Sequence, residues 1–315
     1  MKKWFILVAL AAVVAGAASF TTVPPVNTKA ALGEKLFNEK ILSKDSSVSC
    51  ASCHIPSMGF ADSTALSIGI GGTPTTRNTP SVLNMKHRPY FFWDGRAASL
   101  EQQALMPIAN KDEMGLPVAE AVQRLRASKT YRNLFLKIFG SLPTAKNLSA
   151  ALAAYEKTLE TDDSKFDLSF DEEFPLTDSE ERGRVLFVGD KAKCFDCHMG
   201  PDFTNDDFKN IGLYNGTTLN DAGRFNITGN KEDLGKFKTP GLRNVAITAP
   251  YMHNGMFKTL EEVVDYYNNP KAFVKDPVNI DETLREPLGL TADEKADLVN
   301  FLKTLTDKRF NRDTP

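Results

Sequence analysis

The sequence predicts a mainly α-helical protein built from two similar domains. Apolar residues recur at three- and four-residue spacing in several segments, and a series of short motifs is repeated in the second half of the chain. No pattern indicates a sheet beyond short hairpins. With 315 residues, the chain is long enough for two domains, and its 42% hydrophobic and 25% charged residues are ordinary for a globular protein.

The helical pattern marks six segments. Apolar spacing predicts helices over residues 30–38, 118–127, 150–159, 260–267 and 291–305. Thr177 and Glu180 resemble a capping box that opens a sixth helix ending at Phe187. Long loops rich in glycine, proline and asparagine, such as 69–78 and 215–241, lie between the helices. Loops of this length usually carry function or wrap a ligand.

Two segments, 50–54 and 194–198, read C-x-x-C-H and contain all four cysteines and two of the four histidines. This pattern attaches a c-type haem: the thiols bind its vinyl groups and the histidine ligates iron. A pair of disulfides or a Cys/His zinc site is the alternative. We expect two covalently bound haem c groups, each in a class I cytochrome c-like domain. The attachment residues are Cys50, Cys53, Cys194 and Cys197, and the proximal ligands are His54 and His198.

The N-terminus predicts export. Lys2 and Lys3 precede an apolar run over 4–18, which indicates a signal peptide over 1–19. The run is short for a membrane span of about 20 residues, although an uncleaved anchor stays open. Covalent haem attachment in bacteria also takes place outside the cytoplasm, so we expect a periplasmic protein. Removing the two lysines changes the net charge from −2 to −4, which gives no reason to expect nucleic-acid binding.

Motifs in the first half recur in the same order in the second. This order indicates two homologous domains, 20–164 and 165–315, divided within the acidic stretch 161–175. We also consider that the C-terminal tail packs back on the first domain. The paired segments are 32–37 with 182–187, 59–62 with 202–205, 67–69 with 210–212, 79–84 with 239–244, and 93–95 with 253–255.

Four strings give a family resemblance: RNTPSVLN at 77–84, FWDGR at 92–96, EMG at 113–115 and TAPYMHNG at 248–255. The whole mature chain resembles the bacterial di-haem cytochrome c peroxidase and MauG superfamily. The resemblance implies that the N-terminal haem reacts with peroxide and that the C-terminal haem relays electrons to it.

The first haem needs an open face for peroxide. Reductively activated members of the family have a distal histidine at the position that is Ile70 here, and isoleucine cannot bind iron. We therefore expect this haem to be five-coordinate or water-bound without prior reduction. Met58, Met85 and His87 are the side chains that could instead close the site.

Three residues of the first domain match catalytic positions of the family. Glu113 matches the distal acid-base residue, which moves a proton between the peroxide oxygens, and Gln103 matches its polar neighbour. Trp93 matches the tryptophan that lies between the two haems. Without the resemblance, Glu113 would be assigned to a surface turn, Gln103 to a solvent-facing position and Trp93 to core packing.

The second haem has His198 on one face. On the other, the resemblance implies Tyr267, fourteen residues after His253, where MauG-type enzymes have tyrosine and peroxidases have methionine. A tyrosinate ligand favours ferric and higher states. Met252 or Met256 is the alternative ligand. The resemblance places His253 between the haems as a group near, but not on, the iron.

The resemblance also implies an inter-domain calcium ion bound near Asn78, Thr248 and Pro250. Hard oxygen donors, including backbone carbonyls, suit this ion. A homodimer is possible, as in other family members.

The function we expect is reduction of hydrogen peroxide to water in the periplasm, with electrons from a small cytochrome c or cupredoxin. The alternative is a MauG-like oxidase that acts on an oxidisable protein substrate through a high-valent state shared by both haems. A pure electron carrier is a third possibility. Glu113 beside an open haem argues against it.

Overall fold

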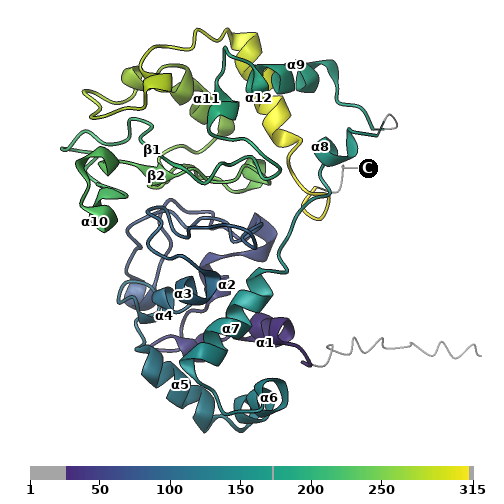
Figure 1. Ribbon diagram of the computed structural model, residues 1–315, viewed down its shortest axis with the longest axis vertical. Helices are drawn as coiled ribbons and strands as arrows, with labels where there is room; N and C mark the ends of the chain where they lie inside the picture. Colours follow the sequence, from purple (N-terminus) through teal and green to yellow (C-terminus); the bar gives the residue numbers. More distant parts are fainter. Residues whose placement is uncertain (1–25, 172–173, 312–315) are drawn as a thin grey trace, which may run out of the picture.

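The computed structural model describes residues 26–171 and 174–311. The signal peptide expected over 1–19 lies outside these residues. Within the described ranges, no helix combines the length and the apolar character needed to cross a bilayer. Figure 1 shows α1 to α7 in one part of the molecule and α8 to α12 with both strands in the other, and the loops of the two parts face each other.

The described chain is mainly helical, with short 3₁₀ turns in the loops. Two-residue strands β1 (Phe208–Lys209) and β2 (Phe237–Lys238) pair antiparallel. A long loop separates these strands, so they do not form the short hairpin allowed by the sequence. The helices are α1 (Lys29–Phe37), α2 (Cys50–Cys53), α3 (Leu100–Gln103), α4 (Met106–Ala109), α5 (Val118–Ala127), α6 (Lys129–Phe139), α7 (Ala145–Glu156), α8 (Lys165–Leu168), α9 (Asp178–Val188), α10 (Phe225–Thr228), α11 (Leu260–Asn268) and α12 (Ala292–Lys303).

The six predicted helical segments are helical, and their boundaries follow the capping residues. The Thr177 side chain accepts from Glu180 N and the Glu180 carboxylate accepts from Thr177 N, which confirms the capping box of α9. Helix α7 begins five residues before the predicted start of 150, because Thr144 caps it. Helix α6 was not predicted. Its apolar residues follow helical spacing, and Ser128 opens it.

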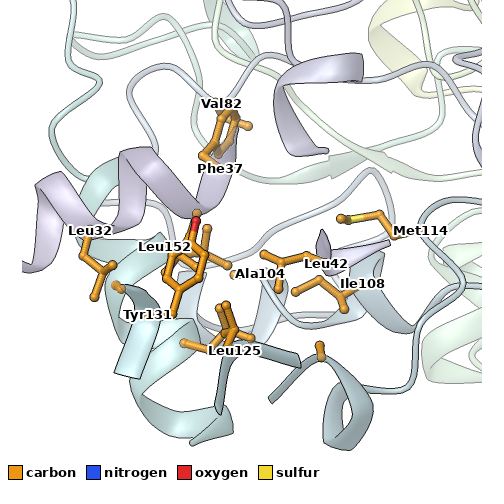
Figure 2. Packing of buried hydrophobic residues seen from close by; sticks show 14 of the residues in the cluster. Leu32, Phe37, Leu42, Val82, Ala104, Ile108, Met114, Leu125, Tyr131 and Leu152 are labelled. Atoms are coloured by element: carbon orange, nitrogen blue, oxygen red, sulfur yellow. The ribbon is translucent and has the colours of Figure 1, made fainter. Parts of the chain in front are cut away.

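The two largest hydrophobic clusters form most of the core. The first joins α1, α5, α6 and α7, and Figure 2 shows Leu125, Tyr131 and Leu152 packed together in it. The second joins α9, α11 and α12 around Phe187 and Phe301. Each fully buried leucine or phenylalanine contributes about 1.5–3 kcal/mol relative to an exposed one. Packing between helices distant in the sequence therefore fixes the loops that connect them.

The same helix crossing occurs twice. Helix α1 packs on α7, and α9 packs on α12, with a glycine at each contact. A Cβ at Gly33 would lie 1.9 Å from Ala151 O, and one at Gly183 would lie 2.0 Å from Asp297 O. Left-handed backbone recurs as well, at Phe60 and again at Phe203. The motifs repeated in the sequence thus adopt repeated backbone conformations.

Polar contacts join the first half (26–164) to the second (165–311). Arg77 binds Asp221 at 2.7 and 2.8 Å, and Arg88 binds Asp206 at 2.8 Å. Phe310, near the C-terminus, packs against the first hydrophobic cluster. The domain boundary at 164/165 stays a prediction.

We expect Gly33→Ala to lower the melting temperature, because the new Cβ would overlap a backbone carbonyl of α7. Overpacking of this kind costs about 1–3 kcal/mol. Gly183→Ala should have a similar effect at the second crossing. Glu34→Ala, at an exposed neighbouring position, is the control and should change stability by less than about 0.5 kcal/mol. Thermal unfolding followed by circular dichroism measures all three; equal melting temperatures would contradict the close-contact argument.

Candidate functional site

One continuous cavity of about 950 Å³ extends between the two halves. Its size is at the upper end of the range of ligand pockets. Every site residue named from the sequence lines it. These are Cys50, Cys53, His54, Asn78, Trp93, Gln103, Glu113, Cys194, Cys197, His198, Thr248, Pro250, His253 and Tyr267.

The first C-x-x-C-H motif forms the short helix α2 and places His54 at its end. The His54 Nδ1 lies 3.1 Å from the carbonyl oxygen of Phe60. An Nδ1–H that donates to this carbonyl leaves Nε2 unprotonated and able to bind a metal. Burial lowers the pKa of His54, which favours this neutral form.

The second motif repeats this arrangement. The His198 Nδ1 lies 2.9 Å from the carbonyl oxygen of Phe203, and burial lowers the pKa of His198 to about 4. The four cysteines are not paired in disulfides. Two thiols and one neutral imidazole therefore line the cavity in each half, which is the donor set that covalent haem c requires.

Glu113 is held by the turn that follows α4. The Asn110 Nδ2 donates to Glu113 Oε1 at 2.7 Å, and Asn110 Oδ1 accepts from Asp112 N at 3.1 Å. Burial raises the pKa of Glu113, although the Asn110 hydrogen bond opposes this shift. Sequence reasoning did not single out Asn110. Its position three residues before Glu113 was the available signal.

Gln103 lies at the end of α3. Its Oε1 is buried and accepts no hydrogen bond from any residue in the ranges 26–171 and 174–311. An unsatisfied buried acceptor costs about 1–3 kcal/mol, and such groups call for a functional explanation when they occur in native proteins.

Ile70 lies beside Glu113 but does not line the cavity. Its N–H donates to Glu113 O at 2.8 Å, and its side chain lies against Gly115, where a Cβ would be 2.2 Å from Ile70 Cδ1. Of the alternative ligands for the first haem, Met85 lines the cavity, whereas Met58 and His87 do not. The open first site stays a prediction, with Met85 as its remaining competitor.

Trp93 is anchored to both halves. Its Nε1 donates to Asn78 O at 2.8 Å, and its carbonyl accepts from Lys238 N at 2.7 Å. His253 lies nearby, with its carbonyl accepting from Asn78 N at 2.7 Å. The His253 ring stacks on Phe237 with centroids 3.8 Å apart, and burial lowers the pKa of His253 to about 4.

A chain of ion pairs crosses the same region, and sequence reasoning did not identify it. Arg96 lies 3.0 Å from Asp94, Asp94 lies 2.6 Å from Arg77, and Arg77 lies 2.7 Å from Asp221. The positive charge of Arg96 opposes the rise that burial causes in the pKa of Glu113. Arg77, Asp94 and Arg96 belong to the strings RNTPSVLN and FWDGR, which were interpreted for family resemblance and not for charge.

Tyr267, on α11, lines the second half of the cavity. Burial is the main cause of its raised pKa, and the charges of Cys197 and Cys194 add to it. Tyr267 thus shares the cavity with both cysteines of the second attachment motif. Of the alternative ligands, Met252 lines the cavity, whereas Met256 is 38% exposed and does not.

The three residues expected at a calcium site all line the cavity between the halves. The Asn78 side chain donates to the carbonyl oxygens of Thr64 and Ala65 at 3.3 and 3.2 Å. A hard cation would need oxygen ligands from these residues, such as their backbone carbonyls. Calcium binding stays a proposal.

Comparisons with known proteins identify the family. The model of the family described as di-haem cytochrome c peroxidase matches residues 27–173. The methylamine utilization protein MauG of Methylorubrum extorquens is 41% identical over 285 residues, which cover 90% of this chain and 79% of that protein. The chain belongs to the di-haem cytochrome c peroxidase family. It is thus an oxidoreductase of the di-haem peroxidase type, and the resemblance seen in the sequence is confirmed.

Other members of this family cover most of the chain. The cytochrome c551 peroxidase of Nitrosomonas europaea is 36% identical, over 90% of this chain and 82% of its own length. Among solved structures, a MauG-like protein associated with microbial copper homeostasis has a TM-score of 0.82 at 35% identity, covering 90% of this chain and 93% of that one. The di-haem peroxidase BthA of Burkholderia thailandensis has a TM-score of 0.80 at 27% identity, covering 91% and 88%.

Replacing Tyr267 with phenylalanine should change the electron paramagnetic resonance signal of the second haem and leave that of the first unchanged, because Tyr267 is the oxygen ligand that we expect at the second haem alone. The spectrum of the ferric protein as isolated measures this. Tyr266→Phe is the matched control, since Tyr266 donates to Ile211 O and does not line the cavity. An unchanged Tyr267→Phe spectrum would assign the ligand to Met252 instead.

Proposed function

We propose that this chain is an exported di-haem peroxidase that reduces hydrogen peroxide to water with electrons from a small cytochrome c or cupredoxin. The observation that carries the proposal is Glu113, a partly buried carboxyl with a raised pKa in the same cavity as His54. The reaction consumes one peroxide, two electrons and two protons and yields two waters.

The two C-x-x-C-H motifs would hold the cofactors. Cys50 and Cys53 would bind the first haem, and Cys194 and Cys197 the second, with His54 and His198 as proximal ligands and Tyr267 as the second ligand of the C-terminal haem. When bound, each haem supplies an iron that exchanges electrons, and the first also accepts peroxide. The carbonyls of Phe60 and Phe203 orient the two imidazoles through Nδ1.

Glu113 would act as the acid-base residue. Its ionised carboxylate accepts a proton from one peroxide oxygen and returns it to the other, so that water can leave. Asn110 holds one carboxylate oxygen in place. The unsatisfied Gln103 Oε1 is the acceptor available to a peroxide O–H or a water molecule.

Trp93 would connect the two sites. Its ring is hydrogen-bonded to the loop that carries Asn78, and its carbonyl to β2 of the second half. An indole held in this way keeps a fixed position between the halves, which suits electron transfer between them. Asn78, Thr248 and Pro250 would bind calcium beside it.

Glu113→Gln should lower the turnover of peroxide by about 10²–10⁴-fold, because glutamine cannot accept the proton. In the wild type, the raised pKa of Glu113 means that the reactive carboxylate is lost on acidification at a higher pH than for a free glutamate. The pH profile of kcat/KM should therefore have an acidic limb that Glu113→Gln lacks. Near-normal turnover of the variant would exclude the acid-base role.

A second function, oxidation of a protein substrate, is favoured by the position of Tyr267 in the same cavity as Cys194 and Cys197 and by the relatives named MauG. Steady-state consumption of peroxide with a reduced small cytochrome c distinguishes the two. We expect the cytochrome to be oxidised at two equivalents per peroxide over many turnovers. Consumption of peroxide that requires another protein and leaves the cytochrome reduced would favour protein oxidation.

A further inference from the structure

Helix α7 ends in a carboxyl group that faces the first site. Glu156 is 5% exposed and lines the cavity. The other buried residues of this helix are leucines and alanines, with Ser149 as the one further polar residue. Throughout residues 26–171 and 174–311, no group donates a hydrogen bond to the Glu156 carboxyl. The Glu156 oxygens are not among the fully buried unsatisfied atoms, so the carboxyl keeps access to the cavity that it lines. A carboxyl held there without a protein partner calls for an explanation other than packing.

The internal repeat shows what the fold itself needs at this position. At the first helix crossing, Gly33 faces Ala151 O and the Cβ of Tyr155; at the second, Gly183 faces Asp297 O and the Cβ of Phe301. Tyr155 therefore corresponds to Phe301, and Glu156, one residue further on, corresponds to Leu302.

Leu302 is 8% exposed and lines the second half of the same cavity. The second site thus has leucine at the place where the first site has a carboxyl. Because the same backbone accepts an apolar residue there, the carboxyl at the first site is not required by the fold.

The surroundings favour a neutral carboxyl. Burial raises the pKa of Glu156 to about 8; the charge of Glu101 on α3 adds to this rise and that of Lys157 opposes it. Lys157 is itself paired with Glu101 at 2.8 Å. Burial raises the pKa of Cys50, the first attachment residue, on α2, and the charge of Glu156 adds to this rise. Burial likewise raises the pKa of Tyr155, and the charge of Glu34 on α1 adds to it.

We propose that Glu156 couples a proton to the electron that enters the first haem. On reduction by the donor protein or a chemical reductant, the haem gains one electron and the Glu156 carboxylate takes one proton from solvent; oxidation returns both. The cause is electrostatic, because a buried negative charge stabilises the more positive, oxidised centre, whereas the neutral acid does not. By linkage, the two equilibria shift each other to the same extent. The proposal rests on the proposed function only in requiring haem at Cys50 and Cys53.

The test is a spectroelectrochemical titration of both haems in the holoprotein, from mildly acidic to mildly alkaline pH. In the wild type, the potential of the first haem should fall as pH rises, with at most a tenfold shift of the reduction equilibrium per pH unit. Glu156→Gln should remove this slope. Glu156→Leu should also remove it, and it reproduces the Leu302 environment, which the fold accepts. The second haem provides a comparison within the same molecule.

Glu101→Gln, at a half-exposed neighbouring position, is the matched control. The potential of the first haem should still depend on pH, but over a lower pH range, because the charge of Glu101 no longer raises the pKa of Glu156. Infrared difference spectra between the oxidised and reduced forms should show a carboxylic-acid band that both Glu156 variants lack. A wild-type potential independent of pH, or a slope that persists in both variants, would overturn the proposal. A slope without peroxide turnover would reject the proposed function alone, and turnover without a slope would reject this inference alone.

Discussion

The hydrogen bonds that converge on Asn78 hold the two halves together where their sites meet. Its carbonyl accepts from the Trp93 indole, and its N–H donates to the His253 carbonyl. Beside these bonds, Arg77 joins Asp94 of the first half to Asp221 of the second. Because these groups are largely removed from water, their pairing is screened little by salt. The single cavity and the fixed place of Trp93 both depend on this junction.

The two halves repeat one backbone but differ in the side chains that face the cavity. Both place an imidazole against the carbonyl of a left-handed phenylalanine. The first half places the glutamates Glu113 and Glu156 on the cavity, whereas the second places Tyr267 there. A duplicated framework can therefore support two chemically different sites, since corresponding positions of the two helix crossings carry Glu156 in one half and Leu302 in the other.

Much of this arrangement could be predicted from the sequence, because it depends on local signals. The C-x-x-C-H motifs, the capping box at Thr177 and the repeated motifs each act over a few residues. What could not be predicted depends on contacts between distant segments. The Arg77–Asp221 pair joins residues 144 positions apart, and the burial of Glu156 depends on how α7 packs. Helix α6 was missed for a simpler reason, since its apolar pattern was present and was not used.

The left-handed residues Phe60 and Phe203 connect the hydrophobic core to the imidazoles of His54 and His198. Phe60 packs edge-on against Phe37 with centroids 6.3 Å apart, and Phe203 packs against Phe187 in the same way at 5.9 Å. The conformation that directs each carbonyl at a histidine is uncommon for a bulky residue, so ring packing must keep it in place. The hydrogen bond to Nδ1 in turn raises the electron-donating power of Nε2. A change of shape in the core, remote from both sites, would therefore alter how strongly each imidazole donates electrons to a metal bound at its Nε2.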